Sequence, residues 1–195
     1  KHSYDLVRVL NENEFNAHIL VENKDYEGVS SWLPLEYDET PVVSIEEGSL
    51  QVRPDDLVII PELFAHVMEQ IADMPCNKVV LCQSYDYLFE TLKPGATWNS
   101  FGFNKVITTS LDQKQYLNDL FKKLNIDVIT PFISELFTKS DKPQKPIISI
   151  HTRDQRDTMK LIKSFYVKYP QFKWVTFRDM RGLSEVEFAN AMKES

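Results

Sequence analysis

The segment 151–156 (HTRDQR) carries the strongest chemical signal in the sequence. It follows the apolar run 147–150 and precedes a stretch with helical spacing, so it is expected to form a strand-to-helix turn. An arginine pairs with phosphate oxygens through two parallel hydrogen bonds, and the amides of a helix N-terminus add further donors. We therefore predict that Arg153 binds a phosphate, assisted by Arg156 or by Lys160 one turn into the helix.

Arg156 and Lys160 also admit a purely structural interpretation. Acidic residues lie close to them in the sequence, at Asp154 and Asp157. Under this interpretation the two cations are solvated surface charges that pair with these carboxylates. The sequence favours phosphate binding for Arg153 and leaves both interpretations open for Arg156 and Lys160.

Polar residues also follow three other apolar runs, at positions where parallel strands would end. Glu62 follows the run 57–60, Gln83 and Ser84 follow the run 79–82, and Ser110 follows Val106-Ile107 and two threonines. Parallel sheets bind ligands outside the carboxyl ends of their strands. Because carboxylate, amide and hydroxyl groups suit sugars and nucleotides, we predict that these four residues line a ligand cleft.

Each of these residues has a simpler explanation as well. Glu62 would open a helix, where the helix dipole favours a carboxylate. Ser110 and Gln113 have the spacing of a capping box, which alone explains the serine. The aromatic residues of the loop 83–103 would either stack on a sugar ring or cover the edge of the sheet.

The apolar runs alternate with amphipathic stretches, which is typical of a parallel sheet. The fold class expected is α/β, with a Rossmann-like parallel sheet that carries helices on both faces. Strands are expected at 16–21, 41–45, 57–60, 78–82, 105–108, 127–130, 146–150 and 172–177. Helices are expected at 3–11, 61–73, from 110, at 157–168 and from 184.

The pattern restarts after a polar, proline-bearing segment at 139–146, which predicts a linker. Residues 1–138 would form a first Rossmann-like domain without its first strand, because the chain opens in a helix. Residues 147–195 would form the first βα units of a second Rossmann-like domain, too few for a complete one. We therefore expect the chain to be part of a larger protein.

Composition excludes several classes of function. The formal net charge of −7 argues against broad nucleic-acid binding, and no apolar run approaches the roughly 18 residues that span a bilayer. Two cysteines without CxxC or HxxxH spacing predict neither a disulfide framework nor a metal site, and a cytoplasmic setting is expected. Walker A and GxGxxG patterns are absent, so nothing supports a nucleotidase or a classical dinucleotide enzyme.

The order of these motifs resembles GT-B glycosyltransferases, most closely their retaining branch. The resemblance lies in strands that end in Pro-Glu, Gln-Ser and Thr-Thr-Ser, the proline-bearing linker, and a second half that opens strand–Arg–helix. The segments 169–177 and 183–189 are similar to the part of the family's donor domain that leads to its acidic motif. In that family an Arg and a later Lys bind the donor diphosphate; Arg153 takes the first place, and Lys160 or Arg156 the second.

The resemblance implies transfer of a sugar from a UDP- or GDP-linked donor, without a metal, to an acceptor held by Glu62, Gln83, Ser84 and Ser110. The chain departs from the family in lacking the glycine-rich first turn, the usual Gly-Arg and a clear Lys-Gly, while the acidic motif would lie beyond Ser195. We therefore expect no turnover from these residues alone. The alternative function is a non-catalytic α/β interaction module; a receiver-like domain fits poorly, because Asp55 and Asp56 precede their strand.

Overall fold

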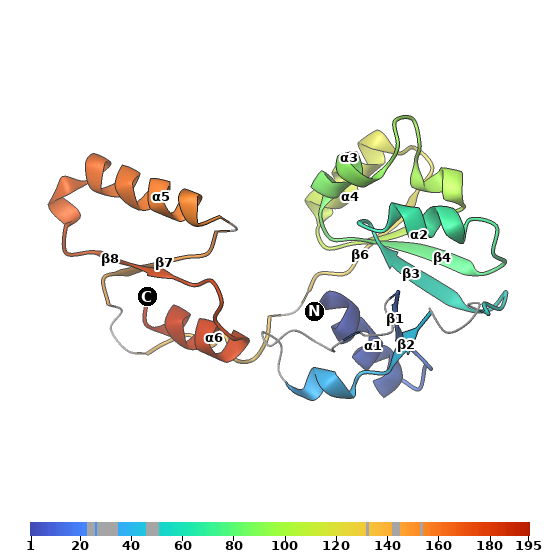
Figure 1. The fold of residues 1–195 in the computed structure, drawn as a ribbon, viewed down its shortest axis with the longest axis horizontal. Coiled ribbons are helices and arrows are strands. Elements are labelled where there is room, and N and C mark those ends of the chain that lie inside the picture. The colour runs from blue at the N-terminus through green and yellow to red at the C-terminus, as the bar shows by residue number, and fades with distance from the viewer. Residues whose placement is uncertain (23–25, 27–34, 46–50, 132, 142–144, 153) are drawn as a thin grey trace. The chain divides into compact units, whose positions relative to one another are not determined.

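The computed structural model describes residues 1–22, 26, 35–45, 51–131, 133–141, 145–152 and 154–195 (Figure 1). The chain forms two compact units, which we describe separately. Unit 1 comprises Lys1–Glu47 and Ile133–Ser195, and unit 2 comprises Gly48–Phe132. No helix among the described residues has the length and apolar character needed to cross a membrane.

Unit 2 is built on a four-stranded parallel sheet with the strand order β3-β4-β5-β6. The strands are β3 (Leu57–Pro61), β4 (Asn77–Cys82), β5 (Lys105–Thr108) and β6 (Asn125–Val128). They are joined by the α-helices α2 (Ala65–Gln70), α3 (Leu88–Thr91) and α4 (Leu111–Leu120), and by the 3-10 helices η2 (Tyr85–Tyr87) and η3 (Trp98–Phe101).

The three α-helices of unit 2 pack on one face of this sheet (Figure 1). Connections between parallel neighbours are almost always right-handed, so a sheet whose strands follow one another in sequence order collects its helices on a single side. The buried cluster shows the result, since alternate strand residues meet the helices and the loop aromatics there. Its members include Ile60, Val80, Val106 and Ile126 from the strands, with Met68, Leu88, Trp98, Phe103 and Leu117.

In unit 1 the strands β7 (Ile147–Ile150) and β8 (Thr176–Asp179) form a parallel pair, joined by α5 (Gln155–Lys168) and η4 (Pro170–Phe172) and followed by α6 (Glu185–Lys193). The ring of Phe177 lies 5.1 Å from that of Phe165 in α5. The next residue, Arg178, donates to the Ala191 carbonyl at 3.2 Å and to Glu194 at 2.8 Å, both from the α6 end. Because successive strand residues point to opposite faces, α5 and α6 cover opposite faces of this pair (Figure 1).

The N-terminal part of unit 1 holds α1 (His2–Glu12), β1 (Ile19–Val21), η1 (Leu35–Glu39) and β2 (Val42–Ser44), with β1 and β2 paired in parallel. Tyr37 is buried, packs edge-on against Tyr4 at 6.2 Å and donates its hydroxyl to Asp5. Lys1 reaches Glu185 at the start of α6, with 2.5 Å between Nζ and Oε1.

The structure confirms an α/β chain with parallel sheets flanked by helices. Among the described residues, helices lie on both faces of the β7–β8 pair but on one face of the four-stranded sheet. The expectation that helices cover both faces of a sheet is therefore met in the β7–β8 pair and not in the four-stranded sheet. The strand expected at 172–177 begins later, because Pro170 opens a 3-10 turn and pairing starts at Thr176. The domain boundaries at 138 and 146 stay a prediction, and residues 142–144 of the expected linker lie outside the described residues.

The helix expected from Pro61 begins only at Ala65. Pro61 is the last residue of β3, and the backbone N–H of Glu62 still donates to the Leu81 carbonyl of β4 at 3.2 Å. Strand pairing thus continues past the proline, whose fixed φ fits an extended chain as well as a first helical turn. The expectation that Glu62 opens a helix is therefore wrong.

Replacing Leu117 by alanine should destabilise unit 2, because this α4 side chain is fully buried in the core cluster. The expected cost is about 2–5 kcal/mol, the usual range for a buried leucine. Hydrogen exchange of peptides from β4 and β5 measures it, since exchange reports unit 2 by itself. Leu111→Ala on the same helix is the control, because Leu111 is 75% exposed; equal effects of the two changes would contradict the packing described.

Candidate functional site

The carboxyl ends of β3, β4 and β5 lie side by side in unit 2. Parallel pairing sets Pro61 opposite Leu81, and Cys82 opposite Thr108. The polar residues that follow the three strands therefore meet at one edge of the sheet, as expected from the sequence. We call this group the unit 2 edge; its members are Glu62, Gln83, Ser84, Ser110 and Gln113.

Glu62 fixes the turn after β4. Its Oε1 accepts hydrogen bonds from the backbone N–H groups of Gln83, at 3.1 Å, and Ser84, at 2.8 Å. The side chain is buried, with the residue 2% exposed, and its Oε2 has no hydrogen-bond partner among the described residues. Burial raises the pKa of the neighbouring Cys82 thiol to about 12, and the charge of Glu62 adds to the shift.

Gln113 is a member of the unit 2 edge that sequence reasoning assigned only to a capping box. Its Nε2 donates to the Gln83 carbonyl at 2.7 Å, and its Oε1 accepts from the Thr108 hydroxyl at 2.5 Å and from the Thr109 N–H at 3.1 Å. Ser110 does cap α4, accepting from the Gln113 N–H at 3.2 Å. Only the serine half of the expected box is formed, because the glutamine side chain instead ties β5 to the turn after β4. The two threonines before the cap were the signal that could have suggested this.

The structure thus brings the four predicted residues of unit 2 together. Glu62 contacts the backbone of Gln83 and Ser84, and Gln113 links Gln83 to Ser110. Trp98 and Phe103 of the following loop are fully buried in the core, so these two aromatic rings pack against the sheet, as the simpler explanation holds. Ligand binding by the unit 2 edge stays a prediction.

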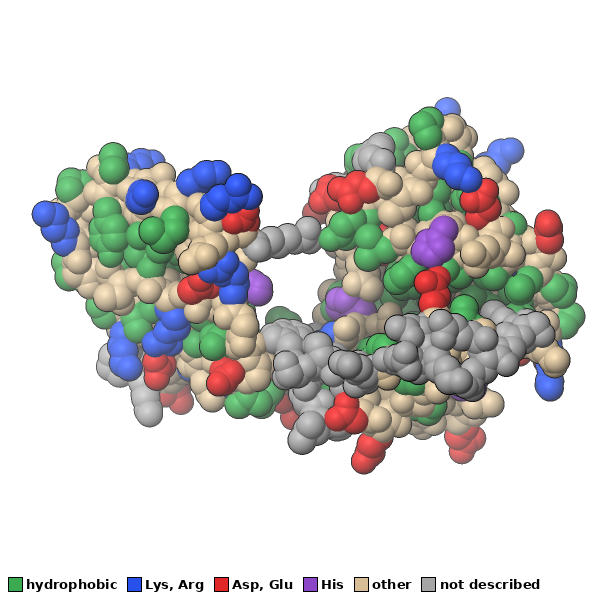
Figure 2. All heavy atoms as spheres, viewed as in Figure 1, with side chains coloured by type: hydrophobic (Ala, Val, Ile, Leu, Met, Phe, Trp, Pro, Cys, Tyr) green, Lys and Arg blue, Asp and Glu red, His purple; other side chains and the backbone are tan. Residues whose placement is uncertain are grey.

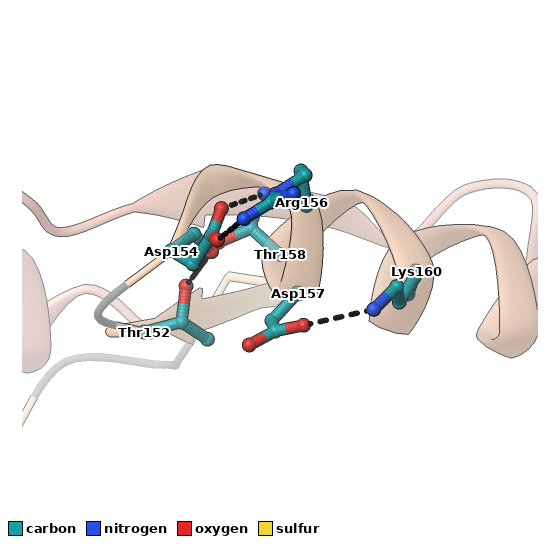
Figure 3. A network of polar contacts seen from close by, with 6 residues as sticks. All are labelled: Thr152, Asp154, Arg156, Asp157, Thr158 and Lys160. Atoms are coloured by element: carbon teal, nitrogen blue, oxygen red, sulfur yellow. Dashed lines mark hydrogen bonds and ion pairs between the residues drawn. The ribbon is translucent and has the colours of Figure 1, made fainter.

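The turn between β7 and α5 is held together by polar contacts (Figure 3). Asp154 caps α5 by accepting from the Arg156 N–H at 2.7 Å, and its second oxygen binds the Arg156 Nε and Nη2 at 3.0 and 2.7 Å. The Thr152 hydroxyl donates to the Asp154 carbonyl at 2.9 Å and lies 2.5 Å from the hydroxyl of buried Thr158. Arg153, the main phosphate ligand expected, lies outside the described residues.

Arg156 and Lys160 lie about one turn apart on α5, and each is paired with an acid. Lys160 contacts Asp157 at 3.2 Å, and Arg156 contacts Asp154 as above (Figure 3). The Arg156 side chain is 85% exposed and the Lys160 side chain is 76% exposed. These are the ion pairs that the structural interpretation named, while phosphate binding by the two cations stays a prediction.

A further arginine, Arg181, joins this site and was missed from the sequence. It follows β8 and is bound by Asp179, which accepts from the Arg181 N–H at 3.0 Å and from Nε at 2.9 Å, and also contacts Nη2. Because β7 and β8 are parallel neighbours, this turn lies at the same edge as the β7–α5 turn. The Arg181 hydrogen bonds lower the pKa of Asp179 to about 2, and the nearby charge of His151 adds to the shift.

We call the two turns after β7 and β8, with His151, Thr152, Asp154, Arg156, Asp179 and Arg181, the unit 1 edge. Figure 2 shows Lys and Arg side chains with acidic ones among them on the part of the molecule that holds these strands. Guanidinium groups held by carboxylates present fixed hydrogen-bond donors to an anion. The unit 1 edge is therefore suited to an anionic ligand.

Comparison with known proteins gives one informative match. The chain is 26% identical over 200 residues to a protein named alpha-1,6-glucosyltransferase from Actinobacillus pleuropneumoniae serotype 7 (strain AP76). The match covers 98% of this chain and 58% of that protein, so the chain spans under three fifths of the relative's length. No family profile and no solved structure matches.

Glu62→Ala should release the turn after β4, because the Gln83 and Ser84 N–H groups lose their acceptor. Exchange of these two amide protons, followed by NMR, is expected to become about tenfold faster or more. Glu62→Gln is the matched control, since its side-chain oxygen still accepts. Unchanged exchange in the alanine variant would show that Glu62 does not hold the turn.

Arg181→Gln should raise the pKa of Asp179 from about 2 towards its ordinary value of 3.8, since Arg181 is the main cause of the lowered pKa. In the native chain this pair stabilises unit 1 above pH 3.8 and loses its effect as the pH falls towards 2. NMR titration of the Asp179 carboxyl carbon measures the shift. Lys163→Gln removes an exposed charge on α5 and should leave the titration as it is; a pKa that stays near 2 in Arg181→Gln would refute the pairing.

Proposed function

We propose that this chain is part of a GT-B glycosyltransferase that transfers a sugar from a nucleotide-sugar donor to an acceptor. The observation that carries the proposal is the similarity to a glucosyltransferase along 98% of the chain. Two parallel-sheet edges with different polar groups support it, because ligands of such folds bind at the carboxyl ends of strands.

In this proposal the unit 1 edge binds the donor. Arg153 contacts the diphosphate, and Arg156 or Lys160 assists from the first turns of α5. Departure of the nucleotide leaves negative charge on the diphosphate, which fixed cations and helix amides stabilise in the transition state. This electrostatic role is the one that a metal ion fills in other transferases, so the proposal expects no metal requirement.

The unit 2 edge would bind the acceptor. A sugar or other hydroxylic acceptor offers donors and acceptors of hydrogen bonds, which the hydroxyls of Ser84 and Ser110 and the amide of Gln83 complement. Glu62 is too deeply buried to touch a ligand as the turn now lies, so its part is to hold Gln83 and Ser84 in place.

The sugar proposed is glucose, following the relative's name, with UDP or GDP as the carrier. The same name gives an α linkage. If this chain makes the same linkage from an α-linked sugar nucleotide, the anomeric configuration is retained, in agreement with the retaining branch that the sequence resembles.

The test is transfer by the full-length protein from radiolabelled UDP- and GDP-glucose to oligosaccharide and glycopeptide acceptors, with and without EDTA. Transfer that persists in EDTA is expected. Arg153→Ala should lower kcat/KM by about a hundredfold, since it removes one fixed donor to the leaving diphosphate. Lys163→Gln, which removes a cation from the exposed side of α5, should have little effect.

Two outcomes would contradict the proposal. If the Arg153→Ala variant kept the native donor affinity and the native rate, Arg153 would have no part in the mechanism. Absence of donor binding by calorimetry across UDP- and GDP-sugars would instead favour a non-catalytic interaction module.

A further inference from the structure

The sequence Arg-Asp-x-Arg occurs twice, at 153–156 and at 178–181, each time where a strand of the β7–β8 pair ends. The second arginine of each copy is held in the same way. Asp154 and Asp179 each accept from the backbone N–H of the residue two positions later, at 2.7 and 3.0 Å, and each also binds that residue's guanidinium. Two neighbouring turns therefore present an arginine in one local geometry.

The aspartate uses only one side of each guanidinium. In Arg156 and in Arg181 the contacts run from Nε and Nη2, which form the lateral edge of the group. A guanidinium has five N–H donors in a planar fork, so Nη1 and the outer N–H of Nη2 remain. Among the described residues, none accepts from Nη1 of either arginine. Both groups thus keep a free pair of parallel donors, the arrangement that binds a phosphate in bidentate fashion.

The two turns also lie close enough to act on each other. Residue Asp179 pairs with Ile150 across the parallel strands, so the turns leave the sheet at nearly the same level. The charge of Arg181 helps to lower the pKa of Asp154, and that of His151 helps to lower the pKa of Asp179. An anion bound at this edge would therefore interact electrostatically with charged side chains of both turns.

Arg181 is the better placed of the two arginines. Its side chain is 30% exposed, against 85% for Arg156. A partly shielded guanidinium has less freedom to lose on binding and interacts more strongly with an anion than a solvated one. The same comparison explains why the exposed Arg156 is a weaker candidate, although the sequence drew attention to it first.

We propose that Arg181, held laterally by Asp179, binds a phosphoryl group of the donor diphosphate through its outer N–H pair. The proposal rests on the proposed function, since it names a residue for the same donor site. The ligand chemistry is a phosphoryl anion, which a nucleoside diphosphate, a nucleotide sugar or free pyrophosphate would supply.

Calorimetric titration of the full-length protein with UDP, GDP and inorganic pyrophosphate tests this, together with the donor KM. Arg181→Gln is expected to weaken nucleoside diphosphate binding by about 10- to 100-fold, as loss of a bidentate charged contact does. Arg181→Lys keeps the charge but not the fork and should remain at least several-fold weaker than native. Arg156→Gln should have a smaller effect than Arg181→Gln, and Lys163→Gln controls for the lost charge.

The outcomes separate this inference from the proposed function. If the native protein binds nucleotide sugars and Arg181→Gln binds them as tightly as Lys163→Gln does, the inference is wrong and the proposed function stands. If pyrophosphate binds through Arg181 while no nucleotide sugar binds, the anion site is real and the proposed function is wrong. A lysine variant with native affinity would show that charge alone matters and would also overturn the geometry proposed here.

Discussion

Where a parallel strand ends, the backbone N–H groups that follow it lose their hydrogen-bond partners in the sheet. The need to provide new partners for these groups is the constraint on which both candidate edges depend. An N–H group in such a turn needs an acceptor, and leaving it unpaired when buried costs about 1–3 kcal/mol. Four side chains supply these acceptors, namely Glu62, Gln113, Asp154 and Asp179. The polar residues at the strand ends therefore stabilise the turns by accepting these hydrogen bonds. Only the donor and acceptor atoms that make no such contact are available to bind a ligand.

Much of this could be read from the sequence, because apolar runs rich in Val and Ile specify strands without long-range help. The strands at 57–60, 78–82 and 105–108 and the helix caps at Ser110 and Ser184 were placed within a residue or so. The helix predicted from Pro61 was wrong because the fixed φ of proline suits a strand end as well as a helix start. Only the pairing of β3 with β4 decides between the two.

The grouping of the missed residues with the other members of each edge depends on strand pairing between segments distant in sequence. From the sequence alone, Gln113 has the spacing of the second residue of a capping box. Its hydrogen bond to the Gln83 carbonyl, 30 residues earlier in the chain, forms only when β5 lies beside the turn after β4. Arg181 looks like an ordinary residue of a loop until β7 and β8 pair and set its turn beside Asp154. Local propensity contains neither fact, since register between strands is a tertiary property.

In the part of the chain that the structure describes, the polar atoms that remain without a partner differ between the two edges, and the two edges therefore suit different ligands. At the unit 2 edge the acidic member is Glu62, and a second carboxylate, that of Asp86, lies 3.4 Å from the Ser84 hydroxyl. The hydrogen bonds described for these two residues include none to a cation. An anion at that edge would meet like charge, whereas a neutral hydroxylic molecule would find amide and hydroxyl partners. At the unit 1 edge the carboxylates are already satisfied by arginines whose outer N–H pairs stay open. These remaining groups favour an anion at the unit 1 edge and an uncharged hydroxylic molecule at the unit 2 edge.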